Sequence, residues 1–215
     1  MPIANQLAPA WQEAAIASVI SLAKAPDGDF GVINKLADVM AEPNSLQAMF
    51  DYLSSLPEGK LAFLERPRVG TVDLPTLAQL PADSFGYAYA QHMLANHLNP
   101  ISAGPVETDL QYLGAHITET HDIWHVITGC NTNILGEIQL EAFYVAQLQS
   151  TRFWLALLTK NLLKAVVYDI EASSQYMKAI CQGWQLGKQA KPLFGMPWQQ
   201  LWSEPLQTIR ANLNL

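Results

Sequence analysis

Apolar residues recur along most of this chain every three or four positions, the spacing of one face of an α-helix. After Thr108, where a helix is predicted to begin, such a face consists of Leu110, Leu113, Ile117, Trp124 and Ile127. Further helices are predicted over residues 14–23, 84–98 and 134–148, and from Pro205 onward. No strand-like alternation persists in the sequence. We therefore predict an all-α fold with a single helical domain over residues 1–215.

Residues 151–182 are apolar except for one polar stripe, which predicts one long helix with a single solvent-exposed face. The stripe consists of Lys160, Lys164, Glu171, Ser174, Gln175 and Lys178. A face so widely apolar is typical of a central helix, of a subunit interface as in a homodimer, or of the wall of an apolar cavity. Near the C-terminus, Trp198 and Trp202 have the spacing of core anchors, and Pro57-Glu58-Gly59 is predicted to end an earlier helix.

The composition indicates a globular protein. The chain has 215 residues, of which 50% are hydrophobic and 14% charged, enough for one sizeable core. Its formal net charge of −7 and the lack of a basic cluster argue against nucleic acid as a partner. The two cysteines, Cys130 and Cys181, do not form a Cys-x-x-Cys pair, so neither a disulfide framework nor a thiolate metal site is expected.

The N-terminal apolar stretch imitates a signal peptide only superficially. It lacks a positively charged start, and Glu13 stands where Lys or Arg would be expected. The longest apolar candidate, 153–168, is interrupted by Lys160 and Lys164, so no membrane span is predicted. Because no signal or transit peptide is recognisable, we expect a cytoplasmic protein of bacterial type.

A pair of histidines one helical turn apart is the main candidate for chemistry. His121 and His125 lie about 40° apart around a helix axis, so both imidazoles point the same way. Asp122 follows at the flank of this pair. Two helix histidines with satisfied ring nitrogens would be the structural explanation. Because His121 falls within the predicted apolar face, however, the pair needs an acceptor or a metal.

The turn after these histidines can bring a carboxylate back to them. Gly129, Asn131 and Asn133 interrupt the helix, and two glutamates follow on the next helix, Glu137 and Glu141. The spacing does not choose between these glutamates. Nitrogen and oxygen ligands suit zinc with an open coordination position and also suit ferrous iron, while an oxygen-rich set would admit magnesium.

The helix over residues 84–98 carries polar groups among aromatics. Phe85, Tyr89 and His92 run along one side of it, with Met93 beside them, and Tyr144 shares a face with the two glutamates. These side chains predict either a packed core with internal hydrogen bonds or the wall of a lipid pocket. Phe85, Tyr89, Met93 and Tyr144 are therefore candidate lipid contacts.

The stretch HDIWHVITGCNTNILGE resembles the metal motif of the Coq-four family of ubiquinone (coenzyme Q) biosynthesis proteins, His-Asp-x-x-His followed after eleven residues by Glu. The likeness extends to LPADSFGYAYAQHMLANHLNP and GKQAKPLFGMPWQQLWSEPLQTIRANL, and covers about residues 28–215. It implies a metal site made by His121, Asp122, His125 and Glu137, with zinc as the expected ion. Only this resemblance favours Glu137 over Glu141.

The resemblance also implies a function. Coq-four proteins act in ubiquinone synthesis with other enzymes of the pathway at the membrane surface, and are implicated in oxidative decarboxylation and hydroxylation of a polyprenylated benzoate precursor. We therefore expect a peripheral protein at the inner membrane face that acts as a metal-dependent decarboxylase. The alternative is a non-catalytic, lipid-binding scaffold for the same enzymes.

A third interpretation, a phosphohydrolase of the HD type, follows from the adjacent His121-Asp122 pair alone. This chemistry requires a further upstream histidine and a downstream aspartate. The upstream candidates are His92, His97 and His116, and the downstream candidate is Asp169.

Overall fold

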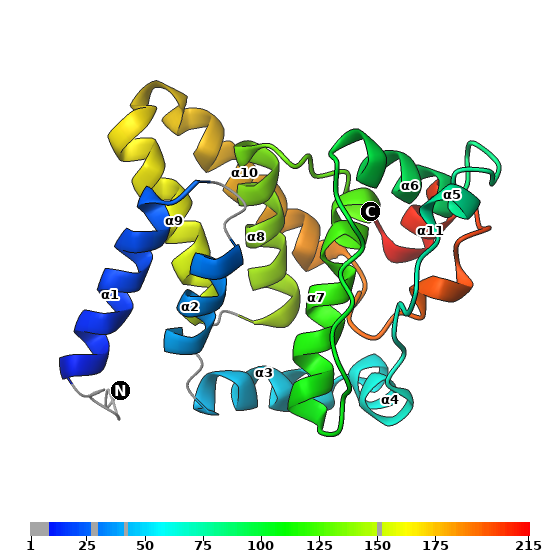
Figure 1. Ribbon diagram of the computed structural model, residues 1–215, viewed down its shortest axis with the longest axis horizontal. Helices are drawn as coiled ribbons and strands as arrows, with labels where there is room; N and C mark the ends of the chain where they lie inside the picture. The colour runs from blue at the N-terminus through cyan, green and yellow to red at the C-terminus, as the bar shows by residue number, and fades with distance from the viewer. Residues whose placement is uncertain (1–8, 27–29, 41–42, 150–151) are drawn as a thin grey trace.

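The protein folds as an assembly of helices (Figure 1). The computed structural model describes residues 9–26, 30–40, 43–149 and 152–215. Within these ranges the α-helices are α1 Pro9–Lys24, α2 Phe30–Met40, α3 Pro43–Ser55, α4 Pro57–Glu65, α5 Leu74–Leu77, α6 Phe85–Ala95, α7 Asp109–Thr128, α8 Ile134–Leu148, α9 Arg152–Tyr168, α10 Ser173–Gln189 and α11 Leu206–Leu213. Two short 3-10 helices, η1 Ile170–Ala172 and η2 Trp198–Gln200, complete the order. The predicted all-α class is confirmed.

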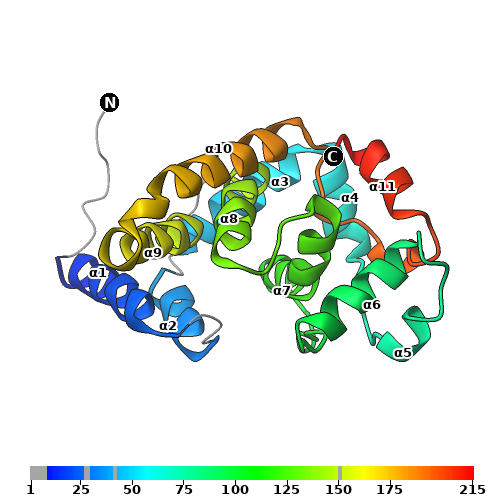
Figure 2. The same cartoon turned by 90° about the horizontal axis from the view of Figure 1, so that it is seen from above.

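The helices are spread along one long axis (Figures 1 and 2). Helices α1, α2 and α9 lie at one end, α5, α6 and α11 at the other, and α7 and α8 lie between them. One hydrophobic cluster runs through the molecule, with members from Ala15 in α1 to Leu213 in α11. Trp198 is fully buried in it, and Trp202 stacks on Phe85 with ring centroids 4.7 Å apart, so both predicted core anchors are confirmed.

Helix α7 begins at the predicted residue because its first turn is capped reciprocally. The Thr108 hydroxyl accepts a hydrogen bond from the Gln111 backbone N–H at 3.2 Å, and the Gln111 side chain accepts one from the Thr108 N–H at 3.0 Å. Such a capping box satisfies N–H groups that the helix itself leaves without partners.

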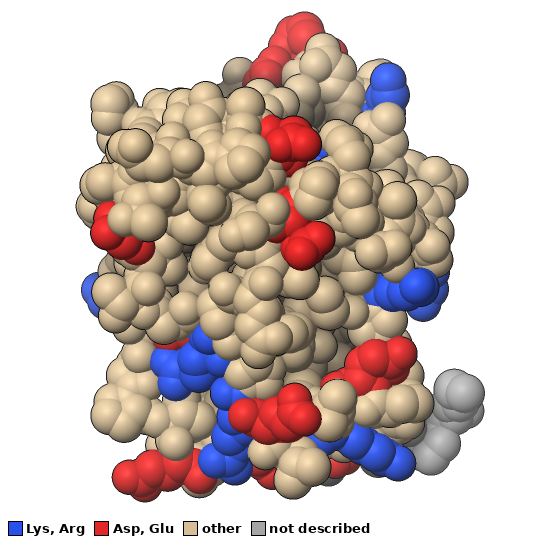
Figure 3. All heavy atoms as spheres, turned by 90° about the vertical axis from the view of Figure 1, so that its right-hand side faces the viewer, with Lys and Arg blue, Asp and Glu red and all other residues tan. Residues whose placement is uncertain are grey.

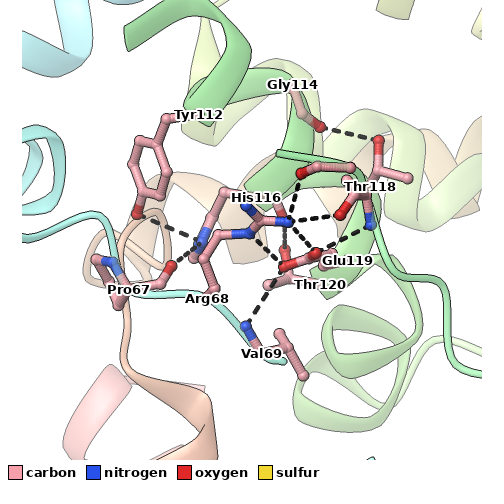
Figure 4. A network of polar contacts seen from close by, with 11 residues as sticks. Pro67, Arg68, Val69, Tyr112, Gly114, His116, Thr118, Glu119 and Thr120 are labelled. Carbon is pink, nitrogen blue, oxygen red and sulfur yellow. Dashed lines mark hydrogen bonds and ion pairs between the residues drawn. The ribbon is translucent and has the colours of Figure 1, made fainter. Parts of the chain in front are cut away.

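An ion pair between the buried Glu119 and the partly exposed Arg68 fixes the side of α7 that faces the loops around it (Figure 4). Glu119 accepts hydrogen bonds from two nitrogens of the Arg68 guanidinium, and also from the backbone N–H groups of Ala103 at 3.0 Å and Val69 at 3.4 Å. These contacts join the segment before α5 and the segment before α7 to the middle of α7. We call Arg68, Glu119 and their backbone partners the clamp.

His116 is built into the same region (Figure 4). Its Nε2 accepts a hydrogen bond from the Gly195 backbone N–H at 3.0 Å, and its Nδ1 lies 3.3 Å from the Pro67 carbonyl oxygen. Both ring nitrogens therefore have partners within the chain. Burial lowers the pKa of His116 to about 4, so the ring is neutral at physiological pH.

The prediction of one long helix over residues 151–182 is wrong. Thr151 lies outside the described residues, and the remainder forms α9 and α10 with a reversal between them. The chain leaves the helical conformation at Asp169, where φ is −154°, and the Tyr176 hydroxyl donates a hydrogen bond to the Asp169 carboxylate at 3.1 Å. The reversal lets α10 pack along α8, where the Gln147 amide donates to the Gly187 carbonyl at 2.8 Å.

A second difference concerns Pro57. The preceding helix α3 ends at Ser55, as Pro57-Glu58-Gly59 predicted, but Pro57 also begins α4. Proline favours the first position of a helix because its fixed φ is already helical and the N–H that it lacks would have no intrahelical partner. The same residue therefore ends one helix and starts the next.

Candidate metal centre

The two histidines of the motif and one glutamate converge at the junction of α7 and α8. The imidazole rings of His121 and His125 have centroids 4.8 Å apart and lie almost perpendicular, at 89°. The His125 Nε2 is 3.2 Å from the Glu137 Oε1. One ligand atom from each of His121, His125 and Glu137 lies within 4.8 Å of the other two. This trio is called the ligand cluster below.

The turn between the helices makes this convergence possible. Gly129 ends α7 with φ +75°, a conformation that is unfavourable for residues with a side chain, and its N–H bonds to the His125 carbonyl at 2.9 Å. Asn133 then caps α8 by accepting from the Gly136 N–H at 2.9 Å. A Cβ on Gly136 would lie 1.9 Å from the Asn131 carbonyl oxygen, so only glycine allows this tight return.

Neighbouring groups orient the two imidazoles. The His125 Nδ1 lies 3.0 Å from the Cys130 carbonyl oxygen, which can only accept, so Nδ1 donates and Nε2 is directed to Glu137. The Tyr144 hydroxyl lies 3.4 Å from the His121 Nδ1. Metal-binding histidines are usually held in this way through their second nitrogen. The donor set of two imidazole nitrogens and one carboxylate therefore fits a divalent metal such as zinc or iron.

The charges in the ligand cluster are coupled. Burial, together with the neighbouring His125, lowers the pKa of His121 to about 4. Burial alone would also lower the pKa of His125, but the hydrogen bond and charge of Glu137 outweigh it and the pKa is raised. The same pairing outweighs the burial of Glu137 and lowers the pKa of its carboxyl. Glu137 is therefore an anion at neutral pH, as a metal ligand must be.

The two other carboxylates near the motif have different surroundings. Asp122 is buried but does not belong to the ligand cluster, and burial raises the pKa of its carboxyl. Its role as a fourth ligand stays a prediction. Glu141 is also buried and outside the ligand cluster, and it accepts a hydrogen bond from Asn161 in α9 at 2.8 Å. Burial raises the pKa of Glu141 to about 8.

Helix α6 supplies one further neighbour, His92. Its ring stacks on that of His125 with centroids 5.7 Å apart and an angle of 25°. Its Nε2 is buried and has no hydrogen-bond partner. Burial and the nearby His125 both lower the pKa of His92. The sequence offered His92 only as one of three upstream histidines for phosphohydrolase chemistry and could not select it, because its contact with His125 depends on how α6 packs on α7.

The four candidate lipid contacts lie in the core. Phe85, Tyr89, Met93 and Tyr144 are each at most 1% exposed. The Tyr144 ring is stacked between those of Trp124 and Trp154, with centroids 4.4 and 4.2 Å away. The structure thus gives these side chains a packing role, and their contact with lipid stays a prediction.

Three of the residues named as candidates for phosphohydrolase chemistry have other surroundings. His116 bonds to Pro67 and Gly195, Asp169 accepts from Tyr176, and His97 is exposed at the end of α6. None of them belongs to the ligand cluster. Of the candidates for that chemistry, only His92 lies against it.

Among the described helices, none combines the length and apolar character that a membrane crossing requires. Figure 3 shows one face on which basic and acidic side chains are interspersed rather than gathered by sign. A hollow of about 310 Å³ lies where η1 and α10 meet the start of α8, and none of the four predicted ligands lines it.

Comparison with known proteins places this geometry in a family. The model of the coenzyme Q (ubiquinone) biosynthesis protein Coq4 matches residues 3–215. The chain belongs to the Coq4 family. Since the match includes residues 121–137, the ligand cluster lies inside the segment that the Coq4 model describes.

Individual Coq4 relatives agree. The mitochondrial ubiquinone biosynthesis protein COQ4 homologue of Drosophila ananassae is 30% identical over 187 residues, covering 80% of this chain and 65% of the relative. The Bos taurus homologue is 29% identical over 182 residues, covering 80% of this chain and 66% of the relative. The chain thus spans about two thirds of the length of these relatives.

A solved structure shares the fold. The crystal structure of a protein from Nostoc punctiforme, described as a ubiquinone biosynthesis protein, superposes with a TM-score of 0.83 at 30% sequence identity. The superposition covers 94% of this chain and 95% of the other. The helical arrangement of Figure 1 is therefore shared with the Nostoc punctiforme protein.

Proposed function

We propose that this Coq4 protein acts in ubiquinone biosynthesis as a metal-dependent protein that binds a polyprenylated benzoate or quinone precursor and carries out its oxidative decarboxylation and hydroxylation. The observation that carries the proposal is the ligand cluster, whose three donor atoms lie within 4.8 Å of one another. Family membership supports the pathway, and the donor set supports zinc, with iron or magnesium as the other candidates.

The residues around the site would share the work as follows. His121, His125 and Glu137 would hold the ion, with Asp122 as the proposed fourth ligand. The Cys130 carbonyl and the Tyr144 hydroxyl would keep the two rings in position, as they do in the structure. When bound, the metal supplies Lewis-acid polarisation of a ligand oxygen.

A scaffold role is the second candidate, and one surface feature favours it. Four apolar residues at the reversal between α9 and α10 are more than half exposed: Val166, Val167, Tyr168 and Ile170. An apolar patch of this kind is typical of a contact with a membrane surface or with another protein. It would serve a peripheral protein that joins other quinone-biosynthesis enzymes, or a second copy in a homodimer, whether or not the site performs chemistry.

The experiment that tests the first proposal has two steps. Metal content and zinc affinity are measured by native mass spectrometry and calorimetry, with Glu137→Gln as the test variant and the exposed Glu204→Gln as its control. We expect the affinity to fall at least about 100-fold in Glu137→Gln and to be unchanged in Glu204→Gln. A single-turnover assay under oxygen with a polyprenylated 4-hydroxybenzoate then follows the release of CO₂.

The outcomes separate the candidates. Turnover by the metal-loaded parent and not by Glu137→Gln supports the enzyme. Binding of the prenylated precursor by the metal-loaded parent, with no turnover, supports the scaffold. If the parent protein takes up no divalent ion under any loading condition, the ligand cluster is not a metal site and the metal-dependent proposal is wrong.

A further inference from the structure

His92 is the one histidine near the ligand cluster whose role the motif does not explain. It comes from α6, whose last turn is held to the α7–α8 turn by a hydrogen bond of 2.9 Å from the Thr132 hydroxyl to the Asn96 side chain. Its ring lies nearly parallel to that of His125. Because the two helices are joined at this point, the position of His92 against the site is fixed by the fold.

The His92 Nε2 differs from the ring nitrogens of the packed histidine in this chain. Both nitrogens of His116 have backbone partners, whereas the His92 Nε2 is buried without any. Buried polar atoms usually have a hydrogen-bond partner. Among the described residues, the Ser54 hydroxyl and the indole nitrogens of Trp124 and Trp198 also lack one, but only His92 has its ring stacked on a member of the ligand cluster. A purely structural histidine at this position would be replaced without loss by an apolar residue of similar shape.

The geometry does not favour His92 as another metal ligand. The atoms of His121, His125 and Glu137 form a mutual group within 4.8 Å, and the nitrogens of His92 are not part of it. Its ring stacks on the face of His125 and does not share the position where the donor atoms converge. His92 therefore lies next to the ligand cluster without belonging to it.

We infer that the His92 Nε2 donates a hydrogen bond to an acidic oxygen, carboxylate or phenolate, of an aromatic ligand bound beside His125 and Glu137. The inference rests on the proposed function, in which the ligand is an aromatic acid, and deepens it by naming the group that recognises the ring head. The imidazole carries its proton on Nε2 in this role, since a deprotonated oxygen can only accept.

The test uses the full chain, Co²⁺ as the metal probe and 4-hydroxybenzoate as the ligand probe. His92→Phe keeps the ring shape and removes the donor, while His92→Gln places an amide nitrogen near the position of Nε2. Co²⁺ affinity and the change of the Co²⁺ absorption bands on adding 4-hydroxybenzoate are the two readouts. The exposed His97→Asn is the matched control, because asparagine tolerates the positive φ of 55° at that position.

We expect Co²⁺ affinity within about threefold of the parent in both His92 variants, because His92 is not a ligand. The affinity for 4-hydroxybenzoate should fall about tenfold or more in His92→Phe, as for loss of a hydrogen bond to a charged group, and recover largely in His92→Gln. Benzoate and phenol, titrated separately, show whether the carboxylate or the phenolate depends on His92.

Three results would overturn the inference. The first is equal binding of 4-hydroxybenzoate by the parent and His92→Phe, and the second is loss of Co²⁺ affinity by 100-fold, which would make His92 a ligand. The third is a metal-loaded parent that binds none of the three probes. If the parent binds no metal, the proposed function fails instead. In that case 4-hydroxybenzoate is titrated into the metal-free parent and the metal-free His92→Phe variant. Weaker binding by the variant supports the role of His92, and equal binding overturns it.

Discussion

Two polar regions of helix α7 differ in how their buried side chains find partners. In the clamp, Glu119 is surrounded by donors from Arg68, Val69 and Ala103, so its charge is satisfied entirely within the chain (Figure 4). At the ligand cluster, which begins only two residues later in the sequence, three donors of metal-ligand type converge and the neighbouring His92 Nε2 has no partner.

The difference teaches how to separate structural from functional polar residues on one helix. A polar group that the protein satisfies completely serves stability, because its removal leaves a buried partner without compensation. Ligand-type atoms that converge on one point beside a buried nitrogen without a partner indicate that something else binds there. His116 and His125 are both buried histidines of α7, yet only the first has backbone partners on both nitrogens.

The largest effect is expected from breaking the clamp. Arg68→Ala leaves the buried Glu119 carboxylate with backbone N–H donors but no ion-pair partner. It should lower the free energy of unfolding by about 3 kcal/mol, the lower end for a broken buried pair, because the Arg68 side chain is itself 26% exposed. Urea denaturation measures this. Arg66→Ala is the control, because its pair with Asp109 is exposed and worth less than about 1 kcal/mol. If Arg68→Ala also lowered the zinc affinity, the clamp and the ligand cluster would not be independent of each other.

The second largest effect is expected from zinc binding at the ligand cluster. At a free zinc concentration 100 times its dissociation constant, the parent should gain about 2.7 kcal/mol in free energy of unfolding, because the ion binds only the folded chain. His125→Gln should gain almost nothing, because the substitution removes the imidazole that faces Glu137 in the ligand cluster and with it one proposed zinc ligand. Thermal denaturation with and without zinc is the measurement, and His97→Asn should behave like the parent. Equal gains in all three proteins would show that zinc binds elsewhere.

Glu141 gives a pH-dependent contrast with Glu119. The pKa of Glu141 is raised from 4.5 to about 8 by burial, so the folded state keeps its proton while the unfolded chain loses it. The unfolded state then binds fewer protons, and stability falls as pH rises between these two values. We expect the contribution of Glu141 to lower the parent's free energy of unfolding by roughly 2 kcal/mol from pH 5 to pH 7.

Glu141→Gln should remove this component, because an amide does not titrate and still accepts the hydrogen bond from Asn161. Urea denaturation across the pH range provides the test. Identical pH profiles for the parent and Glu141→Gln would mean that Glu141 is ionised in the folded protein.

The smallest expected effect concerns the turn. Gly129→Ala forces a side chain into a backbone with φ +75° and should cost about 1 kcal/mol in stability, with a modest loss of zinc affinity. Gly114→Ala on the same helix is the control, because a Cβ there meets no atom within 4 Å and alanine favours the helix. We expect Gly114→Ala to be as stable as the parent or slightly more stable. If Gly129→Ala were as stable as Gly114→Ala, the α7–α8 turn would not require glycine at position 129.

Sequence reasoning was most accurate where the cause of a structure is local. The start of α7 at Thr108, its end at Gly129 and the bounds of α8 follow from caps and turn residues a few positions apart. The approach of a glutamate of α8 to His121 and His125 has the same local cause, because helical spacing and the turn of Gly129, Asn131 and Asn133 bring the two helices back together. The choice of Glu137 over Glu141 required the family resemblance, since both lie on one face of α8.

The sequence by itself determined the helical class, the helix–turn–helix that carries the motif, and the Coq4 membership that its residues encode. Only the tertiary structure decided that α9 and α10 are separate helices, that His116 is a packed residue, and that His92 lies against His125. The physical reason is the range of the contacts involved. Capping and helical spacing act within a few residues, whereas the partners of Glu119, His116 and His92 come from elements far away in the chain and meet them only when the helices pack.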